Sequence, residues 1–230
     1  MIKIGIDVGS TTVKLVAIDE NDNLLFSKYE RHNAKAKETI LSFLKELLSE
    51  IGDKDISLRI TGSIGMGISE KCSLPFVQEV VAAAKAIQKD YSHVTSMIDI
   101  GGEDAKVVFF KDGEATDLRM NGNCAGGTGA FIDQMSIILG VNIDELNHLA
   151  MNAKQVYPIA SCCGVFCKTD IQNLIAKNVS RENIAASIFR AVAVQTVVTL
   201  AHGCDITTPV LFCGGPLTFI LALRKAFIDY

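Results

Sequence analysis

Long hydrophobic runs are missing from this sequence. No apolar stretch reaches the roughly 18 residues that a membrane span requires, so we expect no membrane segment. No export signal precedes the first apolar run, and we therefore expect a cytoplasmic protein. A basic stripe is also missing, and the formal net charge is −4, which argues against nucleic acid as a partner. Tryptophan is absent too, but that absence excludes nothing.

The composition that remains is that of a protein with a packed core. Hydrophobic residues make up 49% of the 230 residues and charged residues 21%, so we do not expect disorder. Cysteine is abundant for a chain without an export signal. In a reducing compartment such cysteines more often bind metal, catalyse or lie buried than form disulfides. The seven are Cys72, Cys124, Cys162, Cys163, Cys167, Cys204 and Cys213.

One plan occurs twice along the chain. Each half is predicted to have three strands, with an acid and a glycine in the turn between the first two, followed by helix. We place the first half at residues 1–93 and the second at 94–230, and we expect the second to be cut short at its C-terminus. Four local predictions are tested below: a helix over 127–139, a loop over Gly62, Gly65 and Gly67, a helix starting at Thr169, and one helix over 217–228.

The first turn of each half has the composition of a phosphate-binding loop. Gly9 lets the backbone approach an anion, which the turn amides and hydroxyls can hold, and Lys14 adds a positive charge near the β- or γ-phosphate. Asp7 and Asp99 are the predicted Mg²⁺ ligands, through water molecules. Two ordinary hairpin turns are the alternative, but the repeated order of acid and glycine favours phosphate. The segments are Asp7-Val8-Gly9-Ser10-Thr11-Thr12-Val13-Lys14 and Asp99-Ile100-Gly101-Gly102-Glu103-Asp104-Ala105-Lys106.

Two further segments suggest ligands. Gly214-Gly215-Pro216 follows a predicted strand, and its glycines would let an adenine or ribose lie against the backbone, although alone it reads as an ordinary strand–helix turn. Cys124, and the group Cys162, Cys163 and Cys167, each lie just before a predicted helix, where a thiolate is stabilised. Iron–sulfur clusters favour four thiolates, so a two-fold dimer could complete a site. Buried, inert cysteines are an equally good interpretation at this point.

These segments, in this order, resemble the ATP-dependent activators of 2-hydroxyacyl-CoA dehydratases and the related ATPase subunits of benzoyl-CoA reductase. The resemblance covers nearly the whole chain. It implies the α/β fold of acetate and sugar kinases, actin and heat-shock chaperones, with two ribonuclease-H-like halves and ATP in the cleft. By this resemblance the nucleotide contacts include both loops, Gly127, Gly214 and Gly215, and the catalytic acids are Asp7, Asp99, Glu103 and Asp104.

The resemblance also implies a homodimer with one shared [4Fe-4S] cluster held by two cysteines from each subunit. Cys124 matches the first ligand and Cys163 the second, although the extra thiols of Cys162 and Cys167 leave the second ligand open. ATP hydrolysis would drive one low-potential electron, received from ferredoxin or flavodoxin, into a dehydratase or reductase component that acts on an acyl-CoA. We expect such a protein to be oxygen-sensitive.

Two features depart from the family pattern. Glu103 stands where the family turn commonly has glutamine, near the γ-phosphate, and the C-terminal segment of the short activators is missing. A long, multidomain form of the family begins with a module much like this chain. The alternatives to an activator are a sugar-type kinase of the same fold and a non-catalytic nucleotide or redox sensor.

Overall fold

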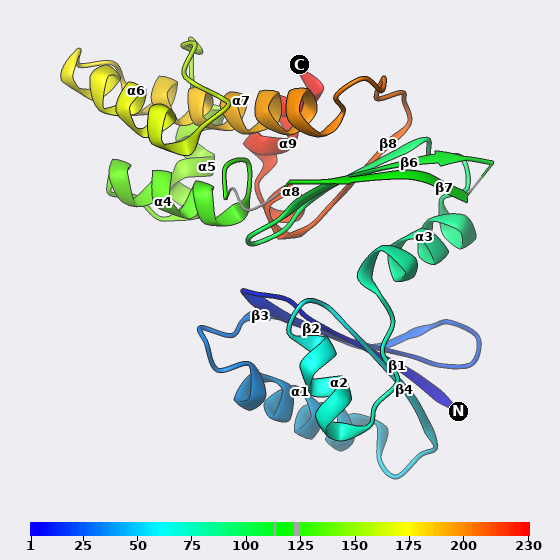
Figure 1. Cartoon of the computed structure of the whole chain (residues 1–230). Coiled ribbons are helices and arrows are strands. Elements are labelled where there is room, and N and C mark those ends of the chain that lie inside the picture. The colour runs from blue at the N-terminus through cyan, green and yellow to red at the C-terminus, as the bar shows by residue number, and fades with distance from the viewer. Residues whose placement is uncertain (113, 122–124) are drawn as a thin grey trace. The chain divides into compact units, whose positions relative to one another are not determined.

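Two compact units make up the chain. The computed structural model describes residues 1–112, 114–121 and 125–230, which divide into Met1–Lys89 and Asp90–Tyr230. Each unit contains a four-stranded sheet (Figure 1), with strand order β3-β2-β1-β4 in the first and β7-β6-β5-β8 in the second. The strands β1 and β5 occupy the same place in the two sheets. Each pairs antiparallel with the strand that follows it and parallel with the fourth strand.

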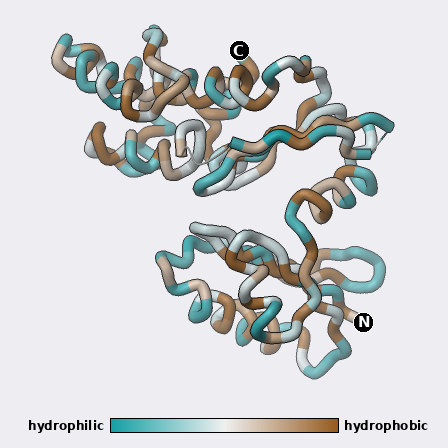
Figure 2. Tube along the Cα trace, viewed as in Figure 1, coloured by the Kyte–Doolittle hydropathy of each residue, from teal (hydrophilic) through white to brown (hydrophobic). Residues whose placement is uncertain are grey.

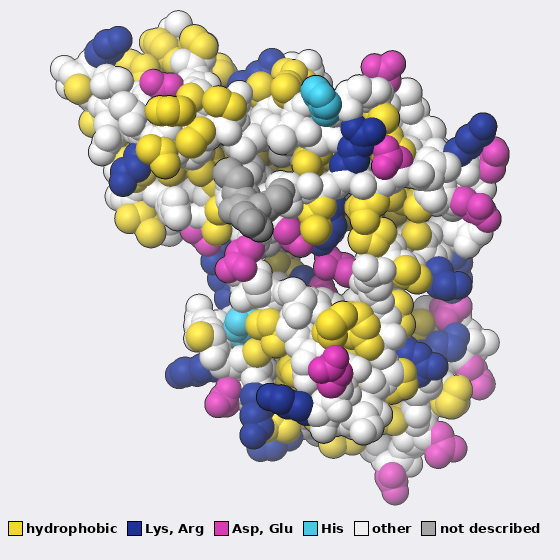
Figure 3. Space-filling view, viewed as in Figure 1, with side chains coloured by type: hydrophobic (Ala, Val, Ile, Leu, Met, Phe, Trp, Pro, Cys, Tyr) yellow, Lys and Arg dark blue, Asp and Glu magenta, His cyan; other side chains and the backbone are white. Residues whose placement is uncertain are grey.

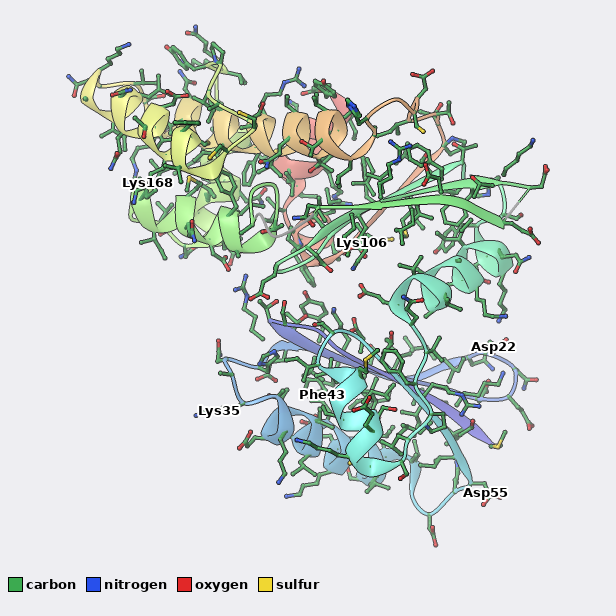
Figure 4. The ribbon with its side chains drawn as sticks, in the orientation of Figure 1. Asp22, Lys35, Phe43, Asp55, Lys106 and Lys168 are labelled. Carbon is green, nitrogen blue, oxygen red and sulfur yellow. The ribbon has the colours of Figure 1, made fainter. Side chains whose placement is uncertain are left out.

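The first unit builds its sheet around a strand, β1, in which buried residues alternate with exposed or half-buried ones. Its core includes Ile4, Ile6 and Leu15 from the sheet, with Phe43 and Leu47 from α1. Phe43, which is labelled in Figure 4, and Leu47 are four residues apart and therefore lie on one helix face. The elements are β1 (Ile2–Val8), β2 (Thr12–Ile18), β3 (Leu24–Arg31), α1 (Ala36–Ile51), β4 (Ile56–Thr61), α2 (Gly65–Cys72) and α3 (Glu79–Asp90), the last of which ends in the second unit.

The second unit covers one sheet with a group of helices (Figure 1). Its largest core cluster joins strand residues such as Ile98 and Val107 to helix residues such as Phe131, Ile171 and Ile188. The elements are β5 (Ser96–Ile100), β6 (Ala105–Lys111), β7 (Glu114–Met120), α4 (Gly129–Leu139), α5 (Ile143–Met151), α6 (Gly164–Ala176), α7 (Arg181–Leu200), β8 (Val210–Cys213), α8 (Gly215–Phe219) and α9 (Leu221–Ile228).

Local chemistry explains where several of these helices begin and end. The Asn142 side chain accepts a hydrogen bond from the N–H of Glu145, whose carboxylate accepts from the N–H of Asn142, so a capping box begins α5. The Ser180 side chain accepts a hydrogen bond from the N–H of Asn183 and so caps α7. Gly140, with φ at +62°, ends α4 in the left-handed conformation that glycine adopts without strain.

Four local predictions need correction. Gly65 and Gly67 lie in α2, not in a loop, because Gly65 packs against Ile60 and Phe76 and this packing outweighs the low helix propensity of glycine. The helix predicted from 127 begins at Gly129, since Gly127 has φ at +79°. The helix predicted from Thr169 begins at Gly164, so Cys167 lies inside it. The single helix over 217–228 is two, because Ile220 is extended between α8 and α9.

Helix α7 bears on the expectation that the chain has no membrane segment. Helix α7 is long and apolar enough to cross a membrane by length and composition, and 56% of its most apolar window is buried inside the protein. Ten of its residues are buried, among them Ile184, Ile188 and Val192 of the core cluster. In Figure 2 this helix alternates between hydrophobic and hydrophilic colours and lies among the other helices of its unit. These features are those of a core helix.

Candidate active site

The two predicted phosphate loops are built on one pattern, which has a lysine seven residues after the acid. Lys14 stands opposite Asp7 across the β1–β2 hairpin, and Lys106 stands opposite Asp99 across the β5–β6 hairpin. The glycine two residues after each acid makes the same backbone hydrogen bond in both loops. The N–H of Gly9 donates to the Thr12 carbonyl at 3.0 Å, and that of Gly101 to the Asp104 carbonyl at 2.8 Å. We call residues 9–12 loop 1 and residues 101–104 loop 2.

The carboxylate of Asp7 is held from two sides. Lys14 Nζ lies 2.7 Å from Asp7 Oδ2. Burial lowers the pKa of Lys14, but the charge of Asp7 and its hydrogen bond more than offset this, so the net pKa is raised. On the other side, Gly62 follows β4 with φ at +92°, and a methyl group there would overlap Asp7 Oδ1 and the Val8 carbonyl. In this structure the ammonium group of Lys14, which we predicted to bind a phosphate, instead forms an ion pair with Asp7.

Gly214 repeats this arrangement in the second unit. It follows β8 with φ at +85°, and a methyl group there would overlap the Ile100 carbonyl oxygen and lie 2.5 Å from Asp99 Oδ1. Its neighbour Cys213 pairs with Asp99 across the parallel strands, and burial together with that acid raises the pKa of Cys213 to about 11. Gly214 is therefore required for a close approach to the acid, and Gly215 begins α8. Their predicted contact with adenosine stays a prediction.

Lys106 is a further candidate site residue, which sequence reasoning did not single out. Its side chain, labelled in Figure 4, is only 6% exposed, and Nζ lies 2.8 Å from Oδ2 of Asp104, which is 43% exposed. A buried ammonium requires such a partner. The available signal was the spacing, because the segments Asp7–Lys14 and Asp99–Lys106 have the same length and the same order of acid, glycine and lysine.

Loop 2 is joined to the start of helix α4. The N–H of Gly129 donates to the Gly101 carbonyl at 2.9 Å, and that of Ala130 donates to the Gly102 carbonyl at 2.7 Å. A methyl group on Gly129 would lie 3.1 Å from the Gly101 oxygen and 3.2 Å from Pro216 Cγ, so the small residue allows this approach. Glu103 is exposed at the tip of the loop. Loop 2 and the first turn of α4 thus form one hydrogen-bonded structure.

The remaining candidate glycine, Gly127, is not in loop 2. It precedes α4, and a methyl group there would lie 3.5 Å from Thr196 Oγ1 on α7. A methyl group on its neighbour Gly126 would overlap the Gln195 side chain. The glycines of this segment therefore let the chain pass close to α7, and the structure shows this packing role directly.

The cysteines of the second segment differ in their surroundings. Cys163 is half-buried and extended at the N-cap of α6, where its carbonyl accepts the N–H of Cys167 at 3.0 Å. Cys162 is exposed. Cys167 is 1% exposed in the core cluster, and burial, with a smaller effect of Asp170, raises its pKa to about 12. Burial therefore opposes the thiolate form that a metal ligand needs at Cys167. Cys162 and Cys163, in contrast, are not buried in the core.

The starts of α4 and α6 meet. A methyl group on Gly164, the first residue of α6, would lie 3.3 Å from the ring of Phe131 in α4. Cys163 precedes α6 in the sequence and Cys124 precedes α4, but Cys124 lies outside the described residues. Among 1–112, 114–121 and 125–230, no group of three or more His, Cys, Asp or Glu side chains is placed to hold a metal ion.

A comparison with known families decides the assignment. The sequence pattern of the BadF/BadG/BcrA/BcrD ATPase family matches residues 4–230. The chain belongs to this family. The predicted assignments to this family and to ATPases are therefore confirmed.

Relatives in the BadF/BadG/BcrA/BcrD family include activators of CoA-ester dehydratases. The (R)-2-hydroxyglutaryl-CoA dehydratase activating ATPase of Acidaminococcus fermentans is 28% identical over 214 residues, which are 92% of this chain and 82% of the relative. The crystal structure of the A. fermentans dehydratase component A matches 100% of this chain and 88% of its own, with 28% identity and a TM-score of 0.89. The Clostridium difficile 2-hydroxyisocaproyl-CoA dehydratase activator with bound ADPNP matches 100% and 85%, with 27% identity and a TM-score of 0.87.

These likenesses confirm the predicted fold class. Solved kinases that are 14–15% identical to the chain, with TM-scores of 0.50, share its fold, and likeness at that level shows the fold alone. The family thus separates this chain from the sugar kinases within one fold.

Proposed function

We propose that this protein is an ATP-hydrolysing iron–sulfur activator that delivers a low-potential electron to a CoA-ester dehydratase or reductase. The observation that carries the proposal is the coupling of one candidate phosphate loop to one candidate cluster helix, through the hydrogen bonds from Gly129 and Ala130 to loop 2. Family membership and the dehydratase-activating relatives support the same conclusion.

In this proposal the two loops bind the phosphates of ATP. Among the described residues, the N–H groups of Ser10, Thr11, Gly102 and Glu103 donate to no protein acceptor, so they are available to an anion. Asp7 and Asp99 would hold Mg²⁺ through water. Because a metal ion would compete with Lys14 for Asp7, binding would release that ammonium toward a phosphate. Glu103 would stand near the γ-phosphate, and Asp104 would be held there by Lys106.

The cluster would be bound by Cys124 and Cys163 from each subunit of a homodimer. Cys163 fits because it is only half-buried and stands at the N-cap position of a helix, whose N-terminal dipole favours a thiolate or an anionic cluster. Cys167 does not fit, since it is part of the core. A bound cluster supplies one-electron transfer. The electron donor would be ferredoxin or flavodoxin, and the protein would work in the cytoplasm.

Hydrophobic side chains exposed around the start of α6 agree with a partner surface there. Val165 is 71% exposed and Phe166 62% exposed, in the two positions after Gly164. Figure 3 shows hydrophobic side chains gathered over the helical part of the second unit. A second subunit that completes the cluster would cover this surface.

The test is iron and acid-labile sulfide per chain in protein purified without air, together with its oligomeric mass. A dimer with a shared four-iron cluster requires about two irons per chain. C163S should lose the iron, whereas the matched variants C162S and C167S should keep it. A protein that accepts no iron after reconstitution would refute the cluster, and an iron-replete C163S would refute the ligand. ATP turnover, measured alongside, tests the nucleotide part separately.

A further inference from the structure

His32 lies directly behind loop 1. It follows β3, its side chain is 6% exposed, and its backbone N–H donates to the Thr11 carbonyl at 3.1 Å. Its ring Nε2 lies 3.2 Å from the carbonyl oxygen of Gly9. Because a carbonyl oxygen only accepts, this contact requires the hydrogen on Nε2. The other nitrogen, Nδ1, is buried and has no hydrogen-bond partner among the residues that the structure describes.

The two bonds from His32 set the direction of the peptide groups in loop 1. In a planar trans peptide, the C=O and the following N–H point in opposite directions. A Gly9 carbonyl held by the His32 ring therefore directs the Ser10 N–H away from His32. The Thr11 carbonyl, held by the His32 N–H, directs the Thr12 N–H in the same manner. The Gly9 and Thr11 carbonyls therefore face His32, and the N–H groups of Ser10 and Thr12 face away from it.

Loop 2 has the same polarity but obtains it from a different element. There the Gly101 and Gly102 carbonyls accept from the first N–H groups of α4, which directs the N–H groups of Gly102 and Glu103 outward. In the first unit, the ring and the backbone N–H of His32 thus fix the direction of the loop carbonyls. In the second unit, the N-terminus of α4 fixes the direction of the loop carbonyls.

We propose that His32 is the positioning residue of loop 1, and that its Nε2–H holds the Gly9–Ser10 peptide with the Ser10 N–H directed to a nucleotide phosphate. This inference rests on the proposed binding of ATP. The imidazole acts through the loop and does not touch the reacting atoms. Without the Nε2–H donor of His32, the Gly9–Ser10 peptide can rotate. The Gly9 carbonyl oxygen would then point toward the phosphate, and the two negative groups would repel each other.

The test is a matched pair of substitutions. A glutamine amide can place its N–H₂ near the position of Nε2, whereas the shorter asparagine reaches only the position of Nδ1. Calorimetric titration of the full chain with Mg·ADPNP should give H32Q an affinity within about threefold of the parent, and H32N one at least about tenfold weaker, as expected for loss of one buried hydrogen bond. H93N changes an exposed histidine in the second unit and should bind like the parent.

Each other outcome has a definite meaning. Parent protein that binds no ADPNP would refute the proposed function rather than the role of His32. If the parent binds and H32N binds equally well, or if H32Q and H32N weaken equally, donation from Nε2 is not what positions the loop. Nitrogen NMR of the unsubstituted protein gives a test that needs no variant to fold. The Nε2–H form is expected, and a neutral ring with hydrogen on Nδ1 would overturn the inference.

Discussion

Replacement of Gly214 by alanine tests whether the close approach of β8 to Asp99 is required. The residue has φ at +85° and ψ at 157°, a region that is nearly exclusive to glycine and costs other residues about 1–3 kcal/mol. The new methyl group would also overlap the Ile100 carbonyl, and forcing a packed region apart costs about 1–3 kcal/mol more. We therefore expect G214A to lower the free energy of unfolding by about 2–6 kcal/mol.

The matched control is Gly140→Ala at the end of α4. Gly140 also has a positive φ, +62°, but a methyl group there meets nothing within 4 Å. Its cost should be backbone strain alone, about 1–2 kcal/mol. Urea unfolding followed by circular dichroism measures both variants. If G214A loses no more stability than G140A, the overlap with Ile100 has no energetic consequence and the reasoning from the Gly214 contacts is wrong.

Three further predictions concern single side chains. K106M should keep the fold but reduce ATP turnover about tenfold or more, because Asp104 loses a charged hydrogen bond of about 1.5–3 kcal/mol; unchanged turnover would contradict its role. Hydrogen bonds and ion pairs with two lysines lower the pKa of Asp22 from 3.8 to about 2, so the stability that this carboxylate provides is present above pH 3.8 and is lost as the pH falls through 2. D22N should therefore be less stable than the parent at pH 7 and equally stable below pH 2, as acid-unfolding curves can show. In the folded apoprotein at pH 8, iodoacetamide should label Cys162 and leave Cys167 unlabelled until the protein is unfolded, which peptide mass spectrometry can follow.

Much of the fold was predictable from local patterns. The strand β1 alternates buried and exposed residues, and α1 presents Phe43 and Leu47 on one face, so period alone identifies both. The strand β5 is buried at nearly every position, yet its flanking turns still mark it. Helix starts were less predictable. Gly164 begins α6 without a side-chain cap, which leaves no signal in the sequence.

The candidate site was predictable where one segment carries it, and not where distant segments meet. Both acids and loop glycines were predicted because they lie within single hairpins. The burial of Cys167 depends on packing against other helices, and the contact of His32 with Gly9 joins residues 23 positions apart. Neither follows from spacing along the chain. Lys106 was within reach, since it repeats the position of Lys14.

The hydrogen bonds between loop 2 and α4 couple movement of the loop to movement of the helix. Rotation of the peptide that carries the Gly101 or the Gly102 carbonyl must either turn the first residues of α4 or break the hydrogen bond that this carbonyl accepts, which contributes on the order of 1 kcal/mol. The helix is eleven residues long and buried along one side, so a small tilt at Gly129 becomes a larger displacement at Leu139. A chemical event at one turn of the backbone can thus be delivered as movement along the length of a helix.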